Sequence, residues 1–153
     1  MANIPYYQQK DIENIKKLRE MMKALPPFCT EFFRGIEPRT STRTRIAYAY
    51  DLSVFFDFLK KENPVFAKME RMDFQLEQLD QITVTDLEEY MEYLKYRFNE
   101  QNHEIMNQER GIMRKISSLK SFYNYFFRTE KLATNPAALV RLPKLHDKEI
   151  IRL

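Results

Sequence analysis

The sequence has few of the residues that build tight turns, disulfides and metal sites. Its 153 residues include two glycines, one cysteine, two histidines and no tryptophan. Two-residue hairpins need positive φ angles that glycine adopts at little cost, so this composition disfavours a β protein and favours an almost entirely helical one. A lone cysteine, Cys29, excludes an internal disulfide and fits a small core residue. His103 and His146 are too few and too isolated for a metal site, so we expect no metal and no cofactor.

Long apolar runs and catalytic groupings are also missing. No apolar stretch approaches 18 residues and the sequence shows no signal-peptide pattern, so we expect a cytoplasmic protein with no membrane partner. The sequence has no glycine-rich phosphate loop and no recognisable Ser/His/Asp or Cys/His set. We therefore predict that this chain is not itself an enzyme and has no small-molecule substrate.

Aromatic side chains and methionines are plentiful. Twelve Phe, nine Tyr and eight Met supply large apolar surfaces and flexible gap fillers for a core. A chain of this length corresponds to one domain and buries roughly two thirds of its extended surface on folding. The composition thus predicts one helical domain with an aromatic core.

Charge is distributed unevenly along the chain. The formal net charge is only +3, which by itself says little about partners. Residues 110–131, however, hold six Lys or Arg against one acidic residue, whereas residues 70–92 hold eight Asp or Glu against one Arg. We expect the folded domain to have a basic side and an acidic side.

Prolines and capping residues mark the boundaries of the expected helices. We predict a first helix at 11–25 capped by Asp11, a short one at 27–36, a long one at 42–62 capped by Ser41 or Thr42, one from the capping box Thr85–Glu88 to Phe98, and a last one at 110–128. Residues 64–81 are expected to be a loop with room for one helical turn, and 99–109 a polar loop. An extended tail follows from Asn135, and the chain is expected to be cut at Leu153.

The last helix sorts its side chains by type. On a 3.6-residue period one stripe is apolar, with Ile112, Ile116, Leu119, Tyr123 and Phe126. The opposite stripe carries Arg110, Arg114, Ser117, Ser121 and Arg128. A solvated charged face is the ordinary alternative for such a pattern. Acidic partners four residues away are missing, however, and serines at 117, 118 and 121 are poor helix formers, so contact with duplex DNA explains the pattern better.

A second basic, hydroxyl-rich segment opens the helix at 42–62. Thr42, Arg43 and Thr44 lie at its N-terminus, where free N–H groups and the helix dipole favour an anion. The alternative role for Thr42 is ordinary N-capping, which does not exclude DNA contact. Arg43 and Tyr50 lie opposite the expected core stripe, whereas Arg45 lies near the core side.

Two segments together resemble a known family. They are Ser41-x-x-Thr44-x-x-x-Tyr48-x-x-Asp51-Leu52-x-x-Phe55-x-x-Phe58-Leu59 and Arg114-Lys115-Ile116-Ser117-Ser118-Leu119-Lys120-Ser121-Phe122-Tyr123-x-Tyr125, followed by Asn135-Pro136-Ala137 and Leu142-Pro143-Lys144. In order and spacing this resembles the N-terminal core-binding, SAM-like domain of tyrosine recombinases, the phage integrase and Xer-like family, over about residues 41–144. The resemblance implies an all-α compact bundle of four to five helices in two crossed antiparallel pairs. It also implies that helices 42–62 and 110–128 face the DNA major groove, and that the nucleophilic tyrosine belongs to a separate C-terminal domain that this chain lacks.

These observations predict the DNA-binding domain of a site-specific tyrosine recombinase, with double-stranded DNA and other recombinase protomers as partners. We expect N-terminal helices in 1–40, a core-binding domain in 41–141 and a linker in 142–153. The predicted DNA-binding residues are Thr42, Arg43, Thr44, Arg110, Arg114, Lys115, Ser117, Ser118, Lys120, Ser121 and Arg128. Of these, Lys115 and Lys120 are expected at the flanks of the surface, together with Arg141 and Lys144. Two alternatives remain open: a helical protein-interaction module whose acidic 70–92 segment docks a basic partner, and a standalone DNA-binding regulator.

Overall fold

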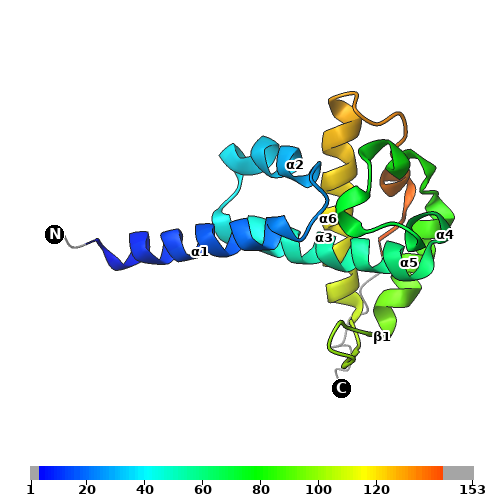
Figure 1. Ribbon diagram of the computed structural model, residues 1–153, viewed down its shortest axis with the longest axis horizontal. Coiled ribbons are helices and arrows are strands. Elements are labelled where there is room, and N and C mark those ends of the chain that lie inside the picture. The colour runs from blue at the N-terminus through cyan, green and yellow to red at the C-terminus, as the bar shows by residue number, and fades with distance from the viewer. Residues whose placement is uncertain (1–3, 143–153) are drawn as a thin grey trace, which may run out of the picture.

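The computed structural model describes residues 4–142, and most of them are helical (Figure 1). In chain order its helices are α1 (Tyr6–Lys23), α2 (Cys29–Ile36), η1 (Glu37–Arg39), α3 (Thr42–Glu62), α4 (Pro64–Ala67), η2 (Arg71–Asp73), η3 (Leu76–Gln81), α5 (Val84–Lys95), α6 (Glu109–Arg128) and η4 (Pro136–Leu139). Strands β1 (Arg97–Phe98) and β2 (Glu104–Ile105) form one short antiparallel pair. Within the described part of the chain, no helix has the length and apolar character needed to cross a membrane.

The two longest core helices, α3 and α6, cross each other at the centre of the domain (Figure 1). Ser41 starts α3, since its hydroxyl oxygen accepts a hydrogen bond from the Thr44 N–H at 3.1 Å. Asn63 and Pro64 end α3, where the proline cannot continue the helical hydrogen-bond pattern. Both helices follow the boundaries predicted from the sequence, and the expected all-α fold class is confirmed.

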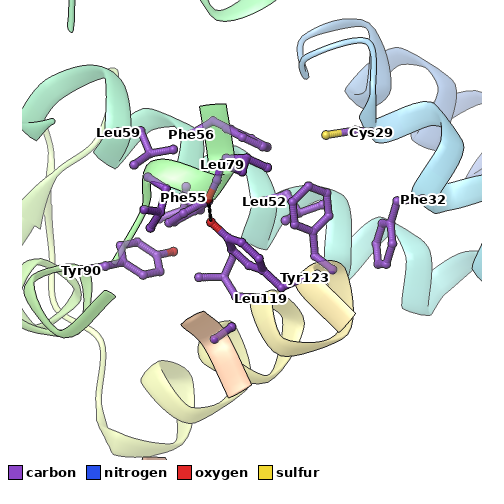
Figure 2. Packing of buried hydrophobic residues seen from close by; sticks show 14 of the residues in the cluster. Cys29, Phe32, Leu52, Phe55, Phe56, Leu59, Leu79, Tyr90, Leu119 and Tyr123 are labelled. Atoms are coloured by element: carbon purple, nitrogen blue, oxygen red, sulfur yellow. Dashed lines mark hydrogen bonds between the residues drawn. The ribbon is translucent and has the colours of Figure 1, made fainter. Parts of the chain in front are cut away.

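Aromatic rings fill the core between the helices. Figure 2 shows Phe55 and Tyr90 on one side of Leu119, with Tyr123 of α6 at the centre of the cluster. Edge-to-face pairs extend this packing toward α2, where the Phe32 and Phe122 ring centroids are 5.3 Å apart. Cys29 is buried in the same cluster, and burial raises the pKa of its thiol far above the usual range. Its predicted role as a small core residue is confirmed.

Helix α1 begins earlier than predicted. It starts at Tyr6 after Pro5, so Asp11 is an interior residue instead of the N-cap. Residues 6–10 contain no helix breaker, and proline before the first turn is compatible with a helix start. Asp11 has a tertiary partner, because its Oδ1 accepts a hydrogen bond from the Thr42 hydroxyl at 3.2 Å. The N-terminal half of α1 projects from the body of the domain (Figure 1), and Tyr6 and Tyr7 on it are exposed.

The segment at 64–81 is more ordered than the predicted loop. It forms α4, η2 and η3, and it buries Phe66, Phe74 and Leu79 against the core. The capping box of α5 also lies two residues before the predicted one: the Thr83 hydroxyl accepts from the Asp86 N–H, and the Asp86 carboxylate accepts from the Thr83 N–H. Both pairs have the required spacing of three residues, and burial of Leu87 and Tyr90 sets the start of the helix.

Helix α5 ends at Lys95, and the chain turns into a β hairpin instead of remaining helical to Phe98. Arg97 pairs with Ile105, and Phe98 pairs with Glu104. The turn between the strands places Asn102 at a φ of 63°. Asparagine tolerates this left-handed conformation better than most residues, which is how a glycine-poor chain still forms a hairpin.

The expected extended tail instead includes a short helix. Asn135 caps η4 through its side-chain oxygen, which accepts from the Ala138 N–H at 3.3 Å, and Pro136 and Ala137 are buried against α6. The predicted linker at 142–153, apart from Leu142, lies outside the described residues. Lys144 and His146 lie outside them too.

A buried hydroxyl links α6 to the 64–81 segment and gives a test of this packing. The Tyr123 hydroxyl donates to the Leu79 carbonyl oxygen at 3.1 Å (Figure 2). Tyr123→Phe should lower the free energy of unfolding by about 1 kcal/mol, because the buried carbonyl loses its side-chain partner. Urea denaturation measures the change. The matched control is Tyr96→Phe, whose hydroxyl bonds Glu104 at the exposed surface. An equal loss in both variants would contradict a special role for the buried bond.

Candidate nucleic-acid interface

The outward face of α6 presents the predicted row of cations and hydroxyls. Arg110, Arg114, Ser117 and Arg128 are exposed, and Ser121 is half-buried. The opposite face buries Ile112, Ile116, Leu119, Tyr123 and Phe126, as the periodicity predicts. Asn124 is also exposed and falls in the same series. The sequence interpretation missed Asn124, although its spacing from Ser117, Ser121 and Arg128 was the signal that could have found it.

The N-terminus of α3 divides its three predicted residues between surface and interior. Arg43 and Thr44 are exposed. Thr42 is buried, and its hydroxyl donates to Asp11 and accepts from the Arg45 guanidinium at 3.2 Å. The expectation that Thr42 contacts DNA is therefore corrected: this hydroxyl joins α3 to α1. Arg43 and Thr44 remain available at the helix N-terminus.

Lys115 and Ser118 point inward, contrary to prediction. The Lys115 side chain is only 1% exposed, and its Nζ lies 3.0 Å from Asp51 Oδ1. The Ser118 hydroxyl donates to the other oxygen of the same carboxylate at 2.6 Å. Ser118 also has a 3.2 Å contact with the Arg114 carbonyl oxygen. Both side chains bind the protein's own carboxylate, so their role is to join α6 to α3 at a buried charge pair.

Arg114 lies beside this pair but keeps its surface exposure. Its Nη2 is 3.7 Å from Asp51 Oδ1, and 61% of its side chain is exposed. That distance is too long for a good hydrogen bond, and Lys115 already neutralises Asp51. Tyr50, also exposed, covers Lys115 with its ring at 4.6 Å from Nζ. The positive charge of Arg114 is thus left facing solvent.

Lys120 holds the end of the described chain against α6. Its Nζ donates to the carbonyl oxygens of Ala137 and Val140, each at 2.7 Å. Both carbonyls belong to the η4 region that follows α6. The predicted role of Lys120 at the flank of a DNA surface is therefore replaced by a structural one. Arg141, just beyond, is exposed.

A cleft of about 310 Å³ lies between α3, η1 and the C-terminal half of α6. It is lined by Ile36, Arg39, Thr40, Tyr48, Ser121, Asn124, Tyr125 and Arg128. Two arginines and three small polar side chains surround this concavity, and no carboxylate does. The Arg128 guanidinium carbon lies 5.7 Å from the Tyr125 ring centroid, which holds the cation near the cleft. Such a lining suits an anionic backbone.

Gly35 sets how closely α2 approaches this cleft. A Cβ atom at this position would lie 2.2 Å from Tyr125 Cε1, well inside van der Waals contact. Tyr125 packs against Phe32 and Phe126 at centroid distances of 5.9 and 5.1 Å, so it has little room to move. Glycine is needed here for close packing of two helices, and it leaves room for the side chain of Tyr125, which lines the cleft.

The described residues contain no group of His, Cys, Asp and Glu side chains arranged to hold a metal ion. The long, exposed α6 row and the α3 N-terminus instead define a class of protein: a helical domain with a cationic, hydroxyl-rich surface. The family model of the phage integrase SAM-like domain matches residues 24–142. The chain belongs to this phage integrase SAM-like domain family.

Several curated relatives are tyrosine recombinases named XerC. The protein of Caldanaerobacter subterraneus subsp. tengcongensis is 35% identical over 147 residues, which cover 90% of this chain and 40% of the relative. That of Anoxybacillus flavithermus is 32% identical over 113 residues, covering 74% and 31%. That of Chlorobaculum tepidum is 30% identical over 142 residues, covering 93% and 35%. The chain therefore spans between about a third and two fifths of the relatives it matches. No solved structure matches the chain at a significant level.

The buried carboxylate of Asp51 gives a direct test of the link between α3 and α6. Asp51→Asn should lower the free energy of unfolding by about 3 kcal/mol, because it leaves Lys115 charged and buried without its counterion. Adding Lys115→Met should restore much of the loss, since both charges then leave together. The control Glu89→Gln removes an exposed carboxylate of α5 and should change stability by less than about 0.5 kcal/mol. Urea denaturation of Asp51→Asn, Lys115→Met, the double variant and the control measures these effects, and strictly additive losses would show that the pair is not coupled.

Proposed function

We propose that this chain is the DNA-binding domain of a site-specific tyrosine recombinase. The observation that carries the proposal is the exposed row on α6, in which small polar side chains lie between Arg110 and Arg114 at one end and Arg128 at the other. Small residues between the cations let a phosphate backbone approach the helix closely. Arg43 and Thr44 add donors at the N-terminus of α3, where the helix dipole favours an anion.

The names of the relatives support a recombinase over a standalone regulator, since those proteins are tyrosine recombinases. We propose that the transesterification chemistry belongs to a part of the full protein outside this chain. We also retain the division into N-terminal helices at 1–40, a core-binding domain at 41–141 and a linker at 142–153. Contacts with other recombinase protomers stay a prediction.

Contacts of the proposed surface are mainly to phosphates. The α6 row and the α3 N-terminus offer guanidinium and hydroxyl groups, while the amides that read adenine are represented on the row by Asn124. Arg39, Ser121 and Arg128 surround the cleft beside the row and extend the cationic surface toward η1. Binding should therefore depend strongly on salt and weakly on sequence.

Salt dependence is the first test. If about four phosphates are neutralised, raising salt from about 50 to about 200 mM should weaken binding to duplex DNA roughly a hundredfold, because condensed counterions are released on binding. Fluorescence anisotropy with a labelled duplex measures the affinity at each salt concentration. Salt-independent binding, or no binding to any duplex at low salt, would contradict the proposal.

Charge removal from α6 is the second test. Arg110→Ala with Arg114→Ala should weaken binding to every duplex and reduce the slope of log affinity against log salt by about 2. The matched control, Lys68→Ala with Lys95→Ala, removes two exposed positive charges, one directly after α4 and one at the end of α5. It should leave both quantities nearly unchanged, and far-ultraviolet circular dichroism should show the same helicity in both variants. Equal affinity of the α6 variant and the parent chain would remove α6 from the interface.

A further inference from the structure

A second cleft lies away from the α6 row, where the C-terminal end of α1, the middle of α3 and the β hairpin meet. Its volume is about 310 Å³, which is at the lower end of the range for small-molecule sites. Its lining is mixed: Met21 and Val54 are apolar, whereas Asp57, Arg71, Arg97 and Glu100 are charged. The cleft can therefore hold a small group that has one charged end and one apolar side.

Arg97 is the unusual member of this lining. It is 5% exposed, and its Nε and Nη2 atoms are enclosed without any hydrogen-bond acceptor. A guanidinium group keeps its charge at all physiological pH values and carries five N–H donors. Burying such a group without a counterion costs several kcal/mol.

Arg45, which is also buried, is an arginine whose guanidinium has hydrogen-bond acceptors within the protein. Arg45 is 7% exposed, and its Nη1 donates to the carbonyl oxygens of Glu37 and Thr40 at 3.1 and 2.6 Å. It also bonds the hydroxyls of Thr40 and Thr42. The fold thus supplies acceptors for a structural arginine, and it supplies none for the enclosed nitrogens of Arg97.

Two phenol hydroxyls lie near Arg97. The buried Tyr90 hydroxyl makes no hydrogen bond. The Tyr93 hydroxyl is also enclosed, and the Lys61 ammonium interacts with it. Burial raises the pKa of both phenols, and the nearby charge of Arg97 acts in the opposite direction on each. These hydroxyls therefore remain protonated donors and do not neutralise Arg97.

Both carboxylates of the cleft lining are already paired with Arg71. Asp57 Oδ1 and Glu100 Oε1 lie 3.1 and 3.4 Å from Arg71 Nη2. Asp57 also pairs at 3.2 Å with Lys61, which lies outside the lining. Neither carboxylate forms an ion pair with Arg97, so a carboxylate that neutralises this guanidinium has to come from a ligand, whereas a polyanion such as DNA would be repelled by Asp57 and Glu100.

We propose that this cleft binds one carboxylate group, held by the Arg97 guanidinium, with the apolar side of the ligand against Met21 and Val54. Arginine recognises carboxylates through two parallel hydrogen bonds, and enclosure strengthens each of them. The site is separate from the α6 row and does not depend on the proposed DNA-binding function.

Titration of the unaltered chain tests the proposal. Sodium propionate should cause a saturable shift of the Arg97 Nε–H resonance in nitrogen–proton NMR spectra and should raise the melting temperature. Sodium chloride at the same ionic strength should do neither. An identical response to the two salts would overturn the proposal, since water alone would then be enough for Arg97. A shift produced by duplex DNA and not by propionate would overturn the carboxylate assignment.

Substitution of Arg97 is the second test of carboxylate binding. Arg97→Met should abolish the propionate response and should leave the melting temperature without propionate equal or higher, because an uncompensated buried charge is removed. The matched control, Arg19→Met, alters an exposed arginine of α1 and should respond to propionate like the parent chain. A large loss of stability in Arg97→Met would show that the protein itself satisfies this side chain and would contradict the proposal.

Sedimentation distinguishes the two sources of a carboxylate. If the natural ligand is a free small molecule, the chain should stay monomeric while propionate binds. If the ligand is an acidic side chain of a second copy, the chain should dimerise at high concentration, and propionate or Arg97→Met should abolish the dimer. Dimerisation that neither change affects, together with no propionate shift, would exclude both sources.

Discussion

The candidate DNA-binding surface depends on the interaction of the buried Asp51 carboxylate with two side chains of α6. The carboxylate accepts from Lys115 and Ser118 of α6 at 3.0 and 2.6 Å, so one side chain of α3 fixes two successive turns of the crossing helix. A charge pair buried this deeply tolerates little displacement, because its desolvation cost is offset only at short distance. The rotation of α6 about its own axis follows from it, and that rotation decides which arginines reach the surface.

The cations of α6 therefore have different roles: some bind groups of the protein itself, and others are exposed to solvent. Lys115 neutralises Asp51 in the interior, and Lys120 binds two carbonyl oxygens of the segment that follows the helix. Arg110, Arg114 and Arg128 stay exposed. A helix anchored through Lys115 and Lys120 in its middle turns presents its exposed charges on a rigid support, which limits the entropy lost when they bind a ligand.

The buried arginines Arg45 and Arg97 also differ in whether the protein supplies partners for their charge. Arg45 ties η1 to the start of α3 by donating to backbone carbonyls, and it is fully explained by the fold. Arg97 has an equally enclosed position on the hairpin but lacks acceptors for two of its nitrogens. In sequence Arg45 lies between Thr44 and Ile46, and Arg97 lies between Tyr96 and Phe98. Neither setting predicts acceptors, so only the arrangement of neighbouring segments distinguishes a structural guanidinium from one available to a ligand.

The sequence by itself determined the helical class, the limits of α3 and α6, the aromatic core and the apolar face of α6, because these depend on local propensity, capping and a 3.6-residue period. It placed the capping box of α5 two residues late and missed the hairpin, since several local solutions there have similar energies and tertiary burial selects among them. Only the tertiary structure decided that Thr42, Lys115, Ser118 and Lys120 face protein partners while Arg43, Arg110 and Arg114 face solvent. Helical phase places a side chain on one side of its own helix. Whether that side faces a carboxylate of the protein or solvent depends on how distant segments pack.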